Sequence, residues 1–135
     1  MKKLMSLIMI MGFLLPLAAQ TWEAPPEAEQ LKNPLAQGEK IKTGEKVYMS
    51  LCAACHGKTG KGDVPAMQGL NPKPTDLTSP EVQKQSDGAL FWKISEGKGL
   101  MASYKNMLSE EERWAVVNYI RTLKQDEVEK KKVKQ

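Results

Sequence analysis

The stretch CAACHG, residues 52–57, decides the fold predicted for this chain. Both cysteines of the sequence, Cys52 and Cys55, and its single histidine, His56, lie within it. Residues three and four positions apart share one face of a helix, so two thiols and an imidazole can meet one flat ligand together. A structural zinc site needs four ligands. Because the chain has only these three Cys and His residues, the spacing disfavours zinc.

The order C-x-x-C-H is the attachment signal of c-type haem. The two vinyl groups of haem accept thiols as thioethers, and its iron accepts an imidazole nitrogen. We therefore predict one covalently bound haem c, with thioethers to Cys52 and Cys55 and with His56 as the proximal axial ligand of the iron. A thioredoxin-like redox pair would need a βαβ pattern, which the sequence lacks.

The N-terminal residues have the features of an export signal. Two lysines in residues 1–3 precede an apolar stretch at 4–17, and small residues allow cleavage after Ala19. The stretch is short for a membrane span of about 20 residues, although an uncleaved anchor is the alternative. We predict a signal peptide at 1–19 and a periplasmic protein. Membrane contact would then occur only through partners or an uncleaved signal.

The charge of the chain argues against a nucleic-acid partner. The formal net charge is +4, and removal of the two leader lysines would leave +2. This balance is mildly basic, and the sequence has no Gly- or Lys-rich phosphate-binding motif. We therefore expect redox proteins, and no nucleic acid, as partners.

Helical signals recur along the rest of the chain. Over 40–51, one face of a predicted helix carries a set of apolar and small residues, namely Ile41, Gly44, Tyr48 and Leu51. Glycine is a poor helix former, so Gly44 on that face indicates the close approach of another helix. Ser79 followed by Pro80 predicts a short helix start, and Ser86 or Asp87 can cap another helix that Gly97 would end.

The last helix is predicted by a capping box of Ser109 and Glu112. An apolar stripe follows, formed by Val116, Tyr119, Ile120 and Leu123. After Lys124 the pattern dissolves, and we predict a charged, solvated tail at 125–135.

The domain prediction follows from these elements. Residues 20–37 read as an extended leader pinned to the domain by Trp22 and Leu35, and 38–124 as the domain itself. The sequence has no alternating apolar run of strand type. We therefore predict an all-α fold, with three to five helices and long loops wrapped around one haem.

Two stretches carry a resemblance to a known family. GEKVYMSLCAACHGKTGKGD at 44–63 and GLMASYKNMLSEEERWAVVNYIRTL at 99–123 resemble a class I monohaem cytochrome c of bacterial periplasmic type. The similarity extends over about 38–123. In that family the N- and C-terminal helices cross at a glycine against an aromatic residue. The resemblance assigns these roles to Gly44, with Tyr48 nearby, and to Tyr119.

The second axial ligand is predicted to be Met101. Of the methionines after the leader, Met49 and Met67 are tied to the His56 side, and Met107 is held near the surface by the following helix. Met101 lies in a loop long enough to cross the distal face, and the family also places its axial methionine there. Met107 is the alternative. The family often has a proline after this methionine, where this chain has Ala102, so the iron–sulfur bond is expected to be more labile.

Further site residues are predicted less specifically. The family uses a loop proline carbonyl to accept the N–H of the ligating histidine, which here implies Pro72 or Pro74. Trp92 and Tyr104 are candidate donors to the haem propionates, and Trp92 is equally well explained as a core residue. Six lysines are candidates for steering an acidic partner to the haem edge, with solubility as the alternative role: Lys58, Lys61, Lys73, Lys93, Lys98 and Lys105.

The predicted ligand set indicates function. An iron with six ligands has no open site for a substrate, so we predict an electron-transfer protein and not an enzyme. It would shuttle single electrons between partners such as a quinol-oxidising complex, a terminal oxidase or a periplasmic dehydrogenase. One alternative is a fixed haem c subunit of a larger dehydrogenase or respiratory complex. Another is an enzyme or sensor in which Met101 dissociates.

Overall fold

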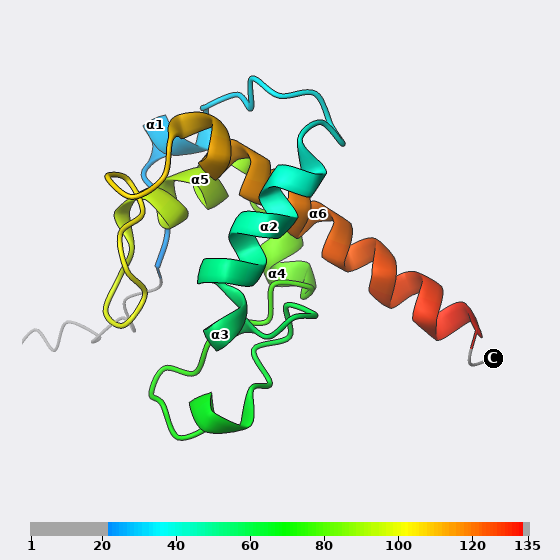
Figure 1. Ribbon diagram of the computed structural model, residues 1–135. Helices are drawn as coiled ribbons and strands as arrows, with labels where there is room; N and C mark the ends of the chain where they lie inside the picture. Colours follow the sequence, from blue (N-terminus) through cyan, green and yellow to red (C-terminus); the bar gives the residue numbers. More distant parts are fainter. Residues whose placement is uncertain (1–21, 134–135) are drawn as a thin grey trace, which may run out of the picture.

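The computed structural model describes residues 22–133, with side chains described as far as Lys124. The predicted signal peptide at 1–19 lies outside the described residues. Helices and loops, without a strand, make up the described part (Figure 1). The elements are α1 (Pro26–Glu29), α2 (Ile41–Leu51), α3 (Ala53–His56), the 3-10 turn η1 (Pro65–Met67), α4 (Pro80–Gln83), α5 (Asp87–Glu96) and α6 (Glu110–Val133).

The all-α prediction is therefore confirmed. The described chain has six α-helices where three to five were expected, because α1, α3 and α4 are single turns of four residues. Within 22–133, no helix has the length and apolar character needed to cross a membrane.

The crossing of α2 and α6 forms the centre of the molecule (Figure 1). A Cβ placed on Gly44 would lie 2.0 Å from the carbonyl oxygen of Ala115 and 3.1 Å from the Cβ of Tyr119. The rings of Tyr48 and Tyr119 pack with their centroids 5.1 Å apart. The expected close approach at Gly44 is thus present. Leu51, predicted on the same face, is instead 40% exposed, because it lies where α2 ends beyond the crossing.

The apolar stripe of α6 is buried as predicted and contributes to one core. The buried cluster consists of Tyr48, Val82, Leu90, Phe91, Ile94, Trp114, Val116, Val117, Tyr119, Ile120 and Leu123. Burial of such side chains contributes about 1.5–3 kcal/mol each. The core therefore holds α2, α4, α5 and α6 together around the crossing.

The predicted caps are largely observed. The Ser109 backbone N–H donates to Glu112 Oε2 at 2.9 Å, and the Glu112 N–H donates to Ser109 Oγ at 3.2 Å. Of the two candidates for the start of α5, Ser86 is the cap, since its Oγ accepts from the Ala89 N–H at 3.1 Å. Gly97 ends α5 with a φ of 67°.

The end of α6 differs from the prediction. The helix continues to Val133, whereas the sequence pattern predicted its end near Lys124 and a solvated tail after it. Residues 125–133 lack the glycine or proline that ends a helix and are rich in glutamate and lysine, which are good helix formers. Figure 1 shows this last part of α6 extending away from the other helices.

The leader predicted as extended contains a helical turn and packs on the domain. Ala28 of α1 is 3% exposed. A Cβ on Gly88 of α5 would lie 2.1 Å from the Ala28 carbonyl oxygen, so the two backbones are in close contact. Leu35 packs against the buried core, and Lys93 Nζ lies 5.6 Å from the centroid of the Trp22 ring. Both residues expected to pin the leader therefore contact the domain.

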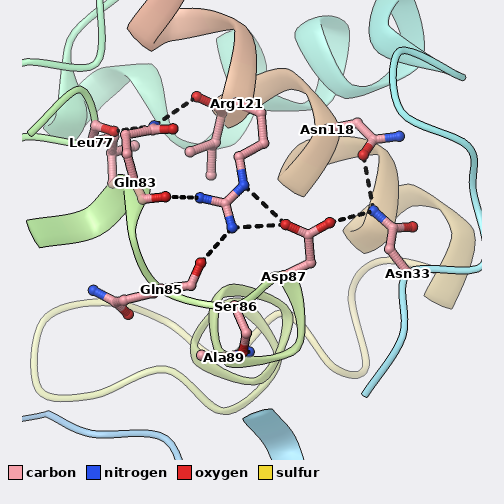
Figure 2. A network of polar contacts seen from close by, with 10 residues as sticks. Asn33, Leu77, Gln83, Gln85, Ser86, Asp87, Ala89, Asn118 and Arg121 are labelled. Carbon is pink, nitrogen blue, oxygen red and sulfur yellow. Dashed lines mark hydrogen bonds and ion pairs between the residues drawn. The ribbon is translucent and has the colours of Figure 1, made fainter. Parts of the chain in front are cut away.

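A polar network centred on Arg121 joins α4, α5 and α6 (Figure 2). Arg121 Nε and Nη2 donate to Asp87 Oδ1 at 2.9 and 2.7 Å. Its Nη1 and Nη2 donate to the carbonyl oxygens of Gln83 and Gln85 at 2.9 and 2.6 Å. A charged side chain of α6 therefore binds the carbonyl of the last residue of α4 and that of a residue just after it.

The same network reaches the leader through Asn33. Its Nδ2 donates to Asp87 Oδ2 at 3.3 Å and to Asn118 Oδ1 at 2.9 Å (Figure 2). Asn118 Nδ2 in turn donates to the carbonyl oxygens of Ala36 and Glu39, both at 3.0 Å. These bonds connect the leader with two helices of the domain.

Candidate functional site

The residues of the CAACHG stretch follow a nearly continuous helical path. The Cys52 N–H donates to the Tyr48 carbonyl at 2.8 Å, and the His56 N–H donates to the Cys52 carbonyl at 2.9 Å. Cys52 therefore joins α2 to α3 through hydrogen bonds of the helical kind, four residues apart. Gly57 then ends the turn with a φ of 79°, and its carbonyl accepts from the buried Tyr48 hydroxyl at 2.7 Å. This path places both thiols and the imidazole on one turn.

Both thiols are free. Cys52 is half-buried and Cys55 is exposed. Burial, with a smaller contribution from Cys55, raises the pKa of the Cys52 thiol to about 11. Cys52 is therefore protonated at neutral pH in this state of the chain.

The imidazole of His56 is held by the carbonyl oxygen of Thr75, which lies 3.0 Å from Nδ1. The expectation of Pro72 or Pro74 as the acceptor is wrong, because the acceptor is the residue directly after Pro74. The Pro74 carbonyl faces the backbone of Gly62, where a Cβ would lie 2.3 Å from its oxygen. The Thr75 carbonyl, one residue further along, is the one that lies within hydrogen-bond distance of His56 Nδ1.

This contact determines which ring nitrogen can bind a metal. A carbonyl oxygen only accepts, so Nδ1 carries the hydrogen and Nε2 keeps its lone pair in the neutral ring. Burial lowers the pKa of His56 and is partly opposed by the Thr75 bond, so the ring is neutral near pH 7. A neutral imidazole oriented by a backbone carbonyl is the usual state of a ligating histidine. Together with two free thiols on the same turn, this donor set fits haem c.

The methionines differ in their surroundings. Met101 is half-buried and packs against the buried core, and its N–H and carbonyl pair with those of Lys98, each at 3.0 Å. Met107 is 58% exposed and Met49 is 38% exposed, while Met67 is half-buried in η1. Packing therefore favours Met101 over Met107, and its role as an axial ligand remains a prediction.

The loop that carries Met101 contacts the attachment turn. The Tyr104 hydroxyl donates to the Leu51 carbonyl at 3.2 Å, one residue before Cys52. Burial raises the pKa of Tyr104, with smaller contributions from Cys52 and Cys55. Loop 97–108 thus lies beside the predicted haem thiols. Trp92 is half-buried and lies outside the buried core cluster, and its role as a propionate donor remains a prediction.

Some of the candidate lysines have partners within the described residues, among them Lys93 and Lys105. Lys93 donates to Gln85 Oε1 at 2.5 Å and lies over Trp22, and burial lowers its pKa. Lys105 pairs with Glu96 at 3.2 Å. Lys58, Lys73 and Lys98 are exposed, so they are better placed to meet a partner.

Sequence reasoning missed the buried pair of Ser95 and Arg113. Ser95 is 3% exposed and Arg113 is 9% exposed, and Arg113 Nη1 donates to Ser95 Oγ. The only available signal was position, because an arginine directly before an apolar stripe can face the core. Thr75, the partner of His56, carried no signal of its own.

The chain is similar to known proteins over most of its described length. The family model described as cytochrome c oxidase, cbb3-type, subunit III matches residues 39–120. Among solved structures, the chain is similar to one from the Kuenenia stuttgartiensis reducing HAO-like protein complex, with a TM-score of 0.59 and 28% sequence identity. The match covers 69% of this chain and 49% of that chain, so it spans about half of the other chain's length. Comparison with curated proteins finds no match.

Proposed function

Because the chain belongs to the family of cytochrome c oxidase, cbb3-type, subunit III, a family of c-type cytochromes that transfer electrons through covalent haem c, we propose that it is a one-electron carrier. When bound, haem c supplies an iron that gains or loses one electron. We propose that the ligands of this haem come from the attachment turn, residues 52–56, and from the loop at 97–108 that follows α5.

One observation supports the attachment proposal most directly. His56 Nδ1 is bound to the Thr75 carbonyl, which leaves Nε2 available, and two free thiols lie on the same turn. We propose that Cys52 and Cys55 form the thioethers and that His56 is the proximal ligand. The neutral ring needs to lose no proton to bind, because burial already lowers its pKa.

Met101 is proposed as the distal ligand. Its loop is attached to the end of α2 by Tyr104, and its side chain packs on the core, whereas Met107 is mostly exposed. Thioether ligation in addition to imidazole raises the reduction potential and leaves no open position for a substrate. These properties suit electron transfer better than catalysis.

An optical redox titration of Met101→Ala tests this proposal. The protein would be produced in a host with cytochrome c maturation, where covalent haem survives extraction with acidified organic solvent. We expect the variant to lose the weak long-wavelength sulfur-to-iron band of the ferric state. Its potential should fall by about 0.1 V or more, within the range of about 0.8 V that axial ligands set.

Met107→Ala is the matched control, since it removes the same side chain from the same loop at an exposed position. It should keep both the band and the potential. If Met107→Ala loses the band and Met101→Ala keeps it, the ligand assignment is wrong. Haem that is removed by the solvent from the wild-type protein would contradict the covalent attachment itself.

We further propose a periplasmic location and redox-protein partners, such as a quinol-oxidising complex, a terminal oxidase or a periplasmic dehydrogenase. The export signal and the exposed residues Lys58, Lys73 and Lys98 support this. A fixed haem c subunit is the second candidate, because the matched family is described as a subunit and the similar structure comes from a complex. Size-exclusion chromatography of a native extract separates the two, since a free carrier elutes near 15.1 kDa or below.

A further inference from the structure

The loop between α5 and α6 is fixed to the end of α5 by three hydrogen bonds. The Tyr104 N–H donates to the Ile94 carbonyl and the Lys105 N–H donates to the Ser95 carbonyl, both at 3.1 Å. The Ser103 hydroxyl donates to the same Ser95 carbonyl at 2.6 Å. The last carbonyls of a helix have no partner within it, so the loop supplies the donors that α5 lacks.

Ser95 is therefore a junction. Its carbonyl receives two bonds from the loop, and its hydroxyl donates to the Phe91 carbonyl at 2.8 Å. The hydroxyl oxygen also accepts a bond from Arg113 Nη1 of α6. Ser95 links α5, α6 and the loop through one buried residue.

Arg113 is fixed in place on the other side of this junction. Its guanidinium lies 4.6 Å from the centroid of the Phe91 ring, which also stacks on the Trp114 ring with the centroids 3.9 Å apart. A hydrogen bond from a charged donor is stronger than one between neutral groups. Removal of the Ser95 hydroxyl would leave this buried guanidinium nitrogen without its hydrogen-bond partner.

The junction is close in sequence to Met101. Ser103 and Lys105 bind Ser95, while Tyr104 between them reaches the Leu51 carbonyl beside Cys52. The loop is thus held at α5 and at the attachment turn by successive residues. From this arrangement we infer that Arg113, acting through Ser95, is a positioning residue that holds Met101 in place as a ligand. The inference rests on the proposed ligation by Met101.

Cyanide binding to the ferric, haem-loaded protein tests it, because cyanide replaces a distal ligand that has left the iron. Ser95→Ala, Ser103→Ala and Arg113→Met should each keep the sulfur-to-iron band. Ser103→Ala removes a hydrogen bond that closes the loop, and Ser95→Ala and Arg113→Met remove the bond that holds Ser95 to α6. Each variant should therefore bind cyanide about threefold to tenfold faster than the wild type. Ser103 is exposed, so its variant remains informative if the buried variants fold poorly.

Thr122→Val is the matched control. It removes a hydroxyl that donates to the Tyr119 carbonyl at 2.7 Å on α6, away from the loop. We expect wild-type cyanide kinetics even if its stability to urea falls. Wild-type cyanide kinetics in Arg113→Met, or in both Ser95→Ala and Ser103→Ala, would overturn the inference. Equal acceleration in Thr122→Val would overturn it as well.

The wild-type spectrum separates this inference from the proposed function. If the wild type lacks the sulfur-to-iron band, the Met101 ligation is wrong and the positioning role is overturned with it. If the wild type has the band and Met101→Ala loses it, unchanged cyanide kinetics in the junction variants overturn the positioning role alone.

Discussion

Gly44 is the residue on which the contact of α2 with α6 depends. The Ala115 carbonyl carbon would lie 2.5 Å and its oxygen 2.0 Å from a Cβ at this position. Both are backbone atoms, so they cannot move aside as the end of a flexible side chain can. Any side chain at position 44 must therefore separate the two helices.

Replacement of Gly44 by alanine should lower the free energy of unfolding by more than about 2 kcal/mol. The two helices would have to shift, and the packing of Tyr48 on Tyr119 would be lost in part. Urea denaturation of the haem-loaded protein measures the change. Gly69→Ala is the control, since nothing lies within 4 Å of a Cβ at Gly69. If Gly44→Ala lowered the free energy of unfolding no more than Gly69→Ala does, the helices would have room to separate.

At the scale of the element, α6 begins at a reciprocal cap. The Ser109 N–H and hydroxyl both donate to Glu112 Oε2 at 2.9 Å. These bonds lower the pKa of Glu112, because they favour the carboxylate. A carboxyl group whose pKa is lower in the folded state stabilises that state above its unfolded pKa. The contribution is lost as the pH falls through the folded pKa.

Glu112→Gln should therefore destabilise the protein near neutral pH, and its effect on stability should be smaller in acid. The stability difference from the wild type should shrink as the pH falls from about 6 to about 3, through the unfolded glutamate pKa of about 4.3. Urea denaturation at several pH values measures it. Glu110→Gln changes the charge of the same first turn without touching the Ser109 bonds and should show a smaller pH dependence. Identical pH profiles for the two variants would contradict the role of the cap.

At the scale of the whole molecule, the leader belongs to the packed structure. Ala28 is buried against α5, Leu35 packs on the core, and Asn33 binds both Asp87 and Asn118. The Arg121 network then connects these contacts with the end of α4. The boundary predicted at residue 38 therefore separates two segments that pack on each other.

A chain that begins at residue 38 should be less stable than one that begins at residue 20. The loss of the buried leader side chains and of the Asn33 bonds should lower the free energy of unfolding by about 2–4 kcal/mol. Asn33→Ala in the longer chain should account for about 1 kcal/mol of this. Urea denaturation of the three haem-loaded proteins gives the comparison. Equal stability of the two chains would mean that the leader is a passive extension.

Features that depend on residues close in sequence could be predicted. Short spacings in the sequence predict three features of this kind. They are the helical path through Cys52, Cys55 and His56, the capping box at Ser109, and the close approach of another helix at Gly44. A helical turn, a cap and a c-type attachment signal are all local patterns, so their geometry is contained in a few neighbouring residues.

The tertiary structure decided the rest. It selects Thr75 over the two prolines as the partner of His56, packs the leader on α5, and joins Arg113 to Ser95 beneath the loop of Met101. Each of these contacts joins residues that are 18 or more positions apart in the chain or belong to different elements. The sequence by itself determined which groups can hold a haem, because local spacing governs a helical turn. Only the folded chain determined what orients them, because a carbonyl or a hydroxyl has no direction until distant segments are packed against each other.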